Sequence, residues 1–160
     1  MSGMEIERKF LVKDRSYREL AHASCHIRQG YLASGGGCTV RVRQRDDEAF
    51  LTIKGPSEDG GLSRYEFEKA ITPDEGRHLM ELCEPGIIDK TRYLVSSGGH
   101  TFEVDEFHGD NEGLVVAEVE LHAADEDYVK PAFIGDEVTG DRRYYNSHLR
   151  RRPYCLWDDR

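Results

Sequence analysis

MEIERKFLV, residues 4–12, alternates charged and apolar side chains along most of its length. Successive side chains of a β-strand point to opposite faces, so Glu5, Glu7 and Lys9 share one face and most of the apolar residues share the other. Such period-2 alternation is typical of a strand with one apolar face. The segment therefore predicts a strand that carries a row of charges.

The same alternation recurs along the chain and predicts a mainly antiparallel β-structure. With the first strand, it predicts eight: Met4–Val12, Cys25–Leu32, Cys38–Arg45, Ala49–Gly55, Leu62–Ile71, Ile87–Ser96, His100–His108 and Leu114–His122. The connections that separate most of them are short and rich in Gly and Asp, which favours antiparallel neighbours.

Helices are expected between and after the strands, which makes the fold class α+β. Capping residues and apolar spacing predict four: Arg15–Ala23 after Asp14, a stretch from Thr72 or Asp74 to Cys83, Asp125–Lys130, and one from Asp141 through Leu149. The charged tail from Arg150 to Arg160 contains Tyr154, Leu156 and Trp157 and is expected to pack back on the body.

Charged residues share one face of nearly every predicted strand. They are Glu5, Glu7, Lys9, Arg41, Arg43, Lys54, Glu66, Glu68, Lys90, Arg92, Glu103, Asp105, Glu118 and Glu120. One interpretation is a sheet with a solvated face, the commonest meaning of alternation. The other is a closed barrel with the charges inside, because eight antiparallel strands suffice to close one. The pairing of like charges, with only Thr39, Thr52 and Thr101 as neutral filler, favours the barrel.

Charges inside a narrow barrel would need a ligand that neutralises both signs. Lys and Arg bind phosphoryl oxygens, and carboxylates hold hard cations such as Mg²⁺ or Mn²⁺. A polyphosphate with bound divalent cations fits this description. The sequence has no Walker-type or kinase phosphate loop, which leaves a cradle made of side chains.

Length and composition limit the other possibilities. The 160 residues correspond to a single domain, 1–160. With 22 Lys and Arg against 31 Asp and Glu, the net charge of −9 argues against nucleic acid or an anionic membrane as the main partner. No apolar run approaches the roughly 18 residues of a membrane span, and the N-terminus resembles no signal peptide, so a cytoplasmic protein is expected. The four cysteines and seven histidines predict neither disulfides nor a metal site.

An ordered set of motifs resembles the CYTH superfamily, the triphosphate tunnel metalloenzymes. Glu5-Ile6-Glu7-Arg8-Lys9-Phe10 is similar to the E-x-E-x-K signature that opens the family. The similarity continues through residues 29–32 (QGYL), 39–43 (TVRVR), 51–55 (LTIKG), 65–68 (YEFE), 90–93 (KTRY), 103–107 (EVDEF), 117–121 (AEVEL) and 135–139 (GDEVT). It covers nearly the whole chain in order.

The resemblance implies an eight-stranded antiparallel barrel whose tunnel holds a triphosphate, with helices outside and a divalent metal, Mg²⁺ or Mn²⁺, as cofactor. It implies that phosphoryl oxygens are bound by Lys9, Arg41, Arg43, Lys54, Lys90 and Arg92, and metal by Glu5, Glu7, Glu118 and Glu120. For Glu66, Glu68 and Asp105 a metal contact and a partner for a tunnel cation remain open. Arg143 could reach the tunnel mouth or lie on the surface.

Two residues carry the catalytic expectation. Small bacterial members of the family pair a tyrosine of the Q-G-Y-L segment with the signature lysine, which here implies Tyr31 and Lys9 as the groups that activate water. A lysine crowded by other cations has a lowered pKa and can accept a proton from water.

The expected activity is therefore hydrolysis of inorganic tripolyphosphate to pyrophosphate and orthophosphate, with a small anionic triphosphate as the partner. Thiamine triphosphate or a nucleoside triphosphate as substrate, a class IV adenylyl cyclase, and a non-enzymatic polyphosphate- or nucleotide-binding module remain alternatives. Many relatives are dimers, so a homodimer stays open, although no contact patch is evident in the sequence.

Overall fold

The computed structural model describes residues 2–158 as nine strands and a few short helices. The strands are β1 (Ser2–Val12), β2 (Ala23–Gly35), β3 (Cys38–Arg45), β4 (Glu48–Glu58), β5 (Ser63–Ile71), β6 (Ile88–Ser97), β7 (His100–Phe107), β8 (Val115–Leu121) and β9 (Ile134–Glu137). The first eight match the eight strands that alternation predicts, with boundaries that differ by a few residues.

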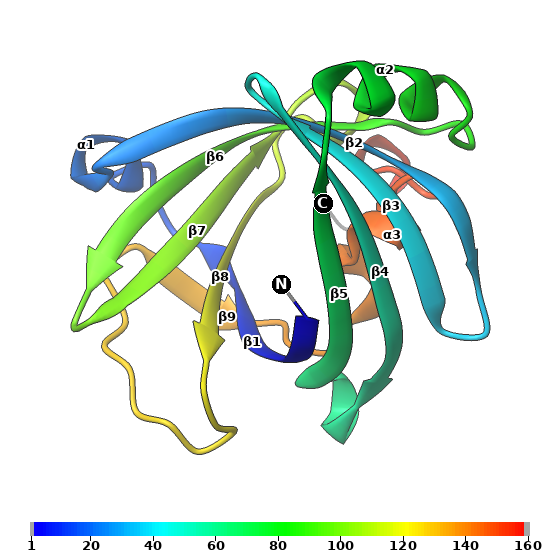
Figure 1. The fold of residues 1–160 in the computed structure, drawn as a ribbon. Helices are drawn as coiled ribbons and strands as arrows, with labels where there is room; N and C mark the ends of the chain where they lie inside the picture. The colour runs from blue at the N-terminus through cyan, green and yellow to red at the C-terminus, as the bar shows by residue number, and fades with distance from the viewer. Residues whose placement is uncertain (1, 159–160) are drawn as a thin grey trace.

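The sheet closes on itself because β1 pairs on both sides. Residues Ser2–Ile6 of β1 pair with β5, and residues Ile6–Leu11 pair with β8, all antiparallel. The strand order β5-β4-β3-β2-β6-β7-β8-β1 therefore returns to β5. Figure 1 shows the strands curving around a common interior. The predicted closed eight-stranded antiparallel barrel is confirmed.

The helices are shorter than expected. They are α1 (Tyr17–Leu20), α2 (Pro73–Glu81) and α3 (Asn146–Leu149), with 3₁₀ turns η1 (Asp59–Gly61), η2 (Gly109–Asn111), η3 (Arg142–Tyr144) and η4 (Tyr154–Leu156). The helix expected over Arg15–Ala23 stops early because β2 begins at Ala23. The last expected helix is divided into η3 and α3 by the extended backbone of Tyr145. No helix among residues 2–158 is long and apolar enough to cross a membrane.

The helix predicted over Asp125–Lys130 is wrong, and β9 was not predicted. Residues 125–130 are irregular, and Glu126 there accepts hydrogen bonds from the backbone N–H of His122 and contacts the ring of His100 at 2.5 Å. These contacts to other segments override a six-residue helix, which is too short to be stable by itself. The four-residue β9 pairs with the end of β1 at Phe10 and Val12.

One apolar core lies outside the barrel wall. The outward side chains of β1, β7 and β8 pack against α1 and the 128–134 segment; the cluster comprises Phe10, Tyr17, Val95, Phe102, Val104, Ala117, Val119, Leu121, Phe133 and Ile134. Buried Glu106 holds α1 to this wall. Its carboxylate accepts a hydrogen bond from the Tyr17 hydroxyl at 2.6 Å and forms an ion pair with Arg18 at 2.5 Å.

A second apolar cluster closes one end of the barrel interior. Ile88, Phe107 and Val116 have the same strand parity as the charged residues of β6, β7 and β8, so they point inward. They pack with side chains of the C-terminal part of the chain, namely Tyr144, Leu149 and Trp157. The tail therefore packs back through Trp157, as expected, whereas Leu156 is exposed. The other predicted tail anchor, Tyr154, packs against this cluster and against the Trp157 ring.

Candidate active site

The charged faces of seven barrel strands, all but β2, turn inward and line one cavity of about 210 Å³. The solvated-sheet interpretation is therefore wrong. Cations in the lining are Lys9, Arg41, Arg43, Arg45, Lys54, Arg64, Lys90 and Arg92. Carboxylates in the lining are Glu5, Glu7, Glu66, Glu68, Glu103, Glu118 and Glu120. Closure of the barrel brings these groups together from strands that are distant in sequence.

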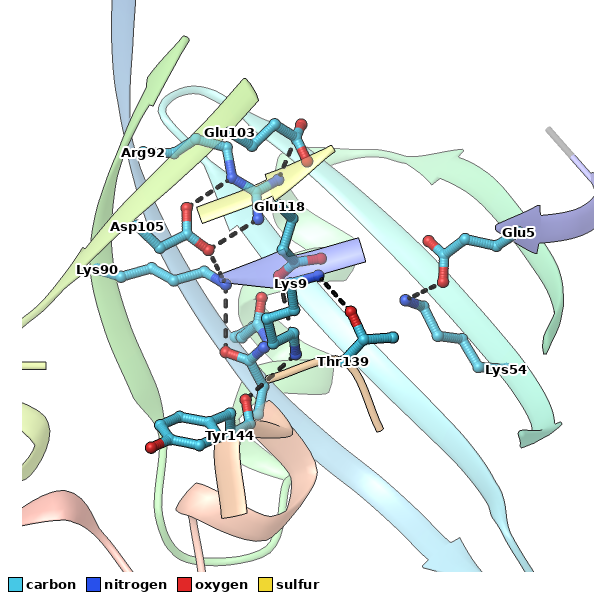
Figure 2. A network of polar contacts seen from close by, with 12 residues as sticks. Glu5, Lys9, Lys54, Lys90, Arg92, Glu103, Asp105, Glu118, Thr139 and Tyr144 are labelled. Carbon is cyan, nitrogen blue, oxygen red and sulfur yellow. Dashed lines mark hydrogen bonds and ion pairs between the residues drawn. The ribbon is translucent and has the colours of Figure 1, made fainter. Parts of the chain in front are cut away.

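At one part of the tunnel, Lys54 joins two carboxylates. Its Nζ lies 2.9 Å from Glu5 Oε1 and 3.5 Å from Glu66 Oε2. Figure 2 shows Lys54 and Glu5 at the right, apart from the other labelled residues. Burial lowers the pKa of Lys54, but Glu5 and Glu7 outweigh it and raise the pKa. Lys54 is therefore a fixed positive charge of the wall.

Across the tunnel, Asp105 organises two cations. Its carboxylate lies 2.8 Å from Lys90 Nζ and accepts two hydrogen bonds from Arg92, at 2.8 and 2.9 Å (Figure 2). Burial raises the pKa of Asp105, but Arg92 and Lys90 outweigh it and bring the pKa to about 2. Asp105 is buried and is not among the described residues that line the cavity. The geometry thus favours its role as a partner that orients cations.

Lys90 is the cation with the most perturbed surroundings. Its side chain is fully buried, and besides Asp105 its Nζ donates to Asn146 Oδ1 at 3.1 Å. Burial, with Arg92 and Arg43 nearby, lowers the pKa of Lys90 to about 7 despite the attraction of Asp105. The lysine crowded by cations is therefore Lys90.

Lys9 contacts a backbone carbonyl, a carboxylate and an aromatic ring. Its Nζ donates to the Tyr144 carbonyl at 3.3 Å, lies 4.0 Å from Glu118 Oε1, and lies 5.2 Å from the centre of the Tyr145 ring. These contacts are acceptors and a π-face, whereas the cations Arg92 and Arg43 act on Lys90. The backbone N–H of Lys9 donates to Thr139 Oγ1 at 2.9 Å, which fixes this end of β1 (Figure 2).

Tyr31 lines the same cavity from β2 and is buried. Its hydroxyl accepts a hydrogen bond from Gln29 Nε2 at 3.4 Å, and the Arg150 guanidinium lies 5.6 Å from its ring centre. Tyr31 is opposite Arg41 in the β2–β3 register. Tyr31 of β2 and Lys9 of β1 therefore line the same cavity.

Four carboxylates of β1 and β8, Glu5, Glu7, Glu118 and Glu120, form the acidic side of the tunnel. Glu7 is opposite Glu120, and Lys9 is opposite Glu118, in the β1–β8 register. Burial and the charges of Glu118 and Glu5 raise the pKa of Glu7 well above its usual range. Burial likewise raises the pKa of Glu120. Burial also acts to raise the pKa of Glu118, but Lys9, the hydrogen bond with Glu7 and the charges of Arg92 and Lys90 together outweigh it and lower the pKa. This side of the tunnel is short of positive charge.

Oxygen donors of this kind suit Mg²⁺ or Mn²⁺. Among residues 2–158, however, no group of three or more His, Cys, Asp or Glu side chains is arranged to hold a metal ion by itself. Magnesium is usually held by one or two carboxylates together with phosphate oxygens of the substrate. The donor chemistry therefore fits a metal that binds together with a phosphate ligand.

The basic side of the tunnel has capacity for an anion. Arg41 is buried, and within the described part of the chain its Nε has no hydrogen-bond partner. Burial and the charges of Arg41 and Arg92 lower the pKa of Arg43, although a guanidinium stays charged at neutral pH. A buried donor without a partner costs free energy, and an oxyanion would satisfy it.

Arg143 does not line the tunnel. It is exposed, pairs with Asp141 at 3.0 Å and lies 5.3 Å from the Trp157 ring centre. Sequence reasoning missed Arg45, Arg64 and Asn146, all of which line the tunnel. The first two share strand parity with Arg43 and Glu66, so alternation could have found them. Asn146 lies on α3, and its position depends on how the C-terminal part packs.

Comparison with known proteins agrees with this geometry. Residues 3–147 match the CYTH domain family. An inorganic triphosphatase of Acetivibrio thermocellus is 47% identical over 153 residues, 95% of this chain and 96% of that protein. An inorganic triphosphatase of Nitrosomonas europaea is 40% identical over 149 residues, 91% of this chain and 95% of that protein. A crystal structure of an inorganic triphosphatase has a TM-score of 0.62 and 32% identity, over 96% of this chain and 95% of that one.

The fold and the site define a closed barrel with a tunnel of mixed charge. The chain belongs to the CYTH domain family.

Proposed function

We propose that this protein hydrolyses inorganic tripolyphosphate to pyrophosphate and orthophosphate inside the tunnel. The observation that carries the proposal is the tunnel lining itself, in which cations from five strands face carboxylates from β1, β5, β7 and β8. Charges of both signs are costly to leave unpaired in such a narrow space, and a phosphate chain with divalent cations neutralises both. The names of the two relatives support the same substrate.

In this proposal the basic side of the tunnel holds the phosphate chain. Phosphoryl oxygens are bound by Lys9, Arg41, Arg43, Lys54, Lys90 and Arg92. Arg41 Nε is the clearest candidate, since it is a buried donor aimed at no other described group. Arg143 is left out, because it pairs with Asp141 on the surface. Fixed charges around the chain would supply most of the rate by positioning and by stabilising the developing charge.

Glu5, Glu7, Glu118 and Glu120 are the proposed ligands of Mg²⁺ or Mn²⁺, with Glu66 and Glu68 as further contacts. A divalent ion bound there would supply positive charge to the phosphoryl oxygens and hold the reacting groups in line. Lys9 is placed to orient Glu118, and Lys54 to orient Glu5.

Water activation is assigned to Tyr31 and Lys9, which would place the attacking water and take its proton. Lys9 Nζ is held by the Tyr144 carbonyl and Glu118, so its position is fixed before substrate binds. Tyr31 is held by Gln29 and by the overlying Arg150.

The test is orthophosphate release from tripolyphosphate, ATP and thiamine triphosphate in parallel, each with Mg²⁺, Mn²⁺ or EDTA. We expect fast release from tripolyphosphate that requires the metal. Release mainly from ATP or thiamine triphosphate would assign an organic triphosphate instead. Conversion of ATP to a cyclic product and pyrophosphate would indicate a cyclase, and binding without turnover would indicate a sensor.

A further inference from the structure

A second cavity, of about 490 Å³ and open to solvent, adjoins the tunnel. It lies where the β2–β3 turn, the end of β4 and the C-terminal segment meet, and Gly37, Pro56 and Arg142 mark these three walls. The two cavities share part of their lining: Thr39, Arg64, Tyr145 and Ser147 belong to both. A group bound in the second cavity would therefore lie next to whatever the tunnel holds.

The second cavity has a charge opposite to that of the protein. Its lining contains Arg64, Arg142, Arg151 and His148, and the described lining residues include no Asp or Glu. The protein as a whole has a net charge of −9. Hydroxyl groups complete the lining: those of Thr39, Ser57, Tyr145 and Ser147. Guanidinium and hydroxyl donors without carboxylates suit an oxyanion and not a metal ion.

Arg64 lies at the boundary between the two cavities and is held in place. Its Nε donates to the Gly55 carbonyl at 3.0 Å, and its Nη2 donates to the Gly37 carbonyl at 3.3 Å. Gly37 has φ +80°, and a Cβ there would lie 3.1 Å from Pro56 Cβ, so the turn packs closely on β4. The part of the second cavity formed by the β2–β3 turn is thus held against β4 by backbone contacts and by Arg64.

We propose that the second cavity binds a phosphate group next to the triphosphate in the tunnel, with Arg142, Arg151 and Arg64 as its main contacts. The inference rests on the proposed triphosphatase function of the tunnel. The phosphate has two sources: the fourth phosphate of a longer linear polyphosphate, or a separate phosphate compound such as the pyrophosphate product. Only binding is assigned to this cavity, and no bond forms or breaks there.

The test compares two double variants that lose the same charge. Arg142→Gln with Arg151→Gln removes two cations of the second cavity, and Lys69→Gln with Arg77→Gln removes two exposed cations of β5 and α2 as a control. Hydrolysis of tripolyphosphate and of linear tetrapolyphosphate is measured with Mg²⁺. Pyrophosphate binding is measured separately by calorimetry in EDTA, with tripolyphosphate at saturation.

If the phosphate belongs to the substrate chain, kcat/KM for tetrapolyphosphate falls about tenfold in the Arg142, Arg151 variant, and that for tripolyphosphate stays close to the control. If the phosphate comes from a separate compound, the affinity of the Arg142, Arg151 variant for pyrophosphate, measured with the tunnel saturated by tripolyphosphate, falls by a similar factor. Either result supports the site, and no difference from the control in both assays would overturn it. Calorimetric binding of pyrophosphate and of tetrapolyphosphate in EDTA needs no turnover, so it tests both sources even if none of the proteins hydrolyses tripolyphosphate, a result that would contradict the triphosphatase proposal alone.

Discussion

Lys9 and Lys90 both point into the tunnel but lie in opposite electrostatic environments. Both alternate into the tunnel, as strand parity predicts, but parity does not determine which side chains meet across a barrel. Lys90 is buried beside Arg92 and Arg43, whereas Lys9 contacts Glu118 and the Tyr144 carbonyl. The Tyr144 carbonyl comes from the far end of the chain. Which side chains become neighbours in this way depends on tertiary packing and cannot be predicted from strand alternation.

Lys9→Ala tests the catalytic assignment. If Lys9 helps to deprotonate water, kcat should fall about 10²–10⁴-fold with a much smaller change in tripolyphosphate affinity. The measurement is steady-state hydrolysis together with calorimetric binding in EDTA. Lys13→Ala, at an exposed position just after β1, is the matched control and should retain activity. Equal losses of turnover and of affinity would show that Lys9 is only a phosphate contact.

The buried carboxylates predict opposite effects of pH on stability. The pKa of Asp105 is lowered to about 2, so its ion pairs contribute stability above about pH 4, and this contribution is lost as the pH falls through about 2. The loss amounts to about 2 kcal/mol. Glu7 has the opposite sign, because burial and the charges of Glu118 and Glu5 raise its pKa. Protonation in the folded state removes the cost of the buried charge and adds stability as the pH falls through the folded pKa.

Urea unfolding of the metal-free protein at a series of pH values measures both effects. We expect the free energy of unfolding to rise as Glu7 is protonated and then to fall between about pH 4 and pH 2. In Glu7→Gln the rise should be smaller and the acid fall unchanged. A monotonic loss of stability from neutral pH downward, the same in both proteins, would contradict the assignment.

At the scale of elements, alternation was sufficient to predict all eight barrel strands but not β9 or the 125–130 segment. The barrel strands repeat charge and apolar character because their two faces meet different environments, the tunnel and the outer core. The four residues of β9 are too few to show a period. Residues 125–130 carry helical signals, yet Glu126 is engaged by His122 and His100. Short elements are determined by their contacts more than by local sequence.

The N-cap of α2 provides a test at this scale. Thr72 Oγ1 accepts a hydrogen bond from the Glu75 backbone N–H at 3.0 Å, and the Glu75 carboxylate accepts one from the Thr72 N–H at 2.8 Å. Thr72→Ala should lower the free energy of unfolding by about 0.5–2 kcal/mol, as measured by urea denaturation. Thr72→Ser keeps the hydroxyl and should lose much less. Tripolyphosphate hydrolysis should be retained in both, since α2 lies on the outside of the barrel (Figure 1).

At the scale of the molecule, closure of the barrel concentrates charge where an ordinary protein has an apolar core. The two apolar clusters lie outside the wall and at one closed end, so the centre contributes little hydrophobic stabilisation. Like charges of β3 and β6 face the same space, as do those of β1 and β8. The charged strand faces in the sequence predicted this arrangement, because buried charges need a ligand of opposite charge to offset their cost. Its consequence is that the folded state should be stabilised by a polyanion.

Tripolyphosphate should therefore raise the melting temperature of the protein even without metal. A ligand that binds only the folded state, at about a hundred times its dissociation constant, adds about 2.7 kcal/mol, which corresponds to roughly 5–10 °C for a chain of this size. Thermal unfolding in EDTA, with and without tripolyphosphate, measures the shift, and sodium sulfate at equal ionic strength controls for general salt effects. Arg41→Gln removes the buried donor that has no partner among the described residues and should reduce the shift, while Arg77→Gln, on the surface of α2, should not. Equal shifts with sulfate and tripolyphosphate would show that the tunnel has no specific affinity for a phosphate chain, because screening alone relieves repulsion between charges without regard to the shape of the anion.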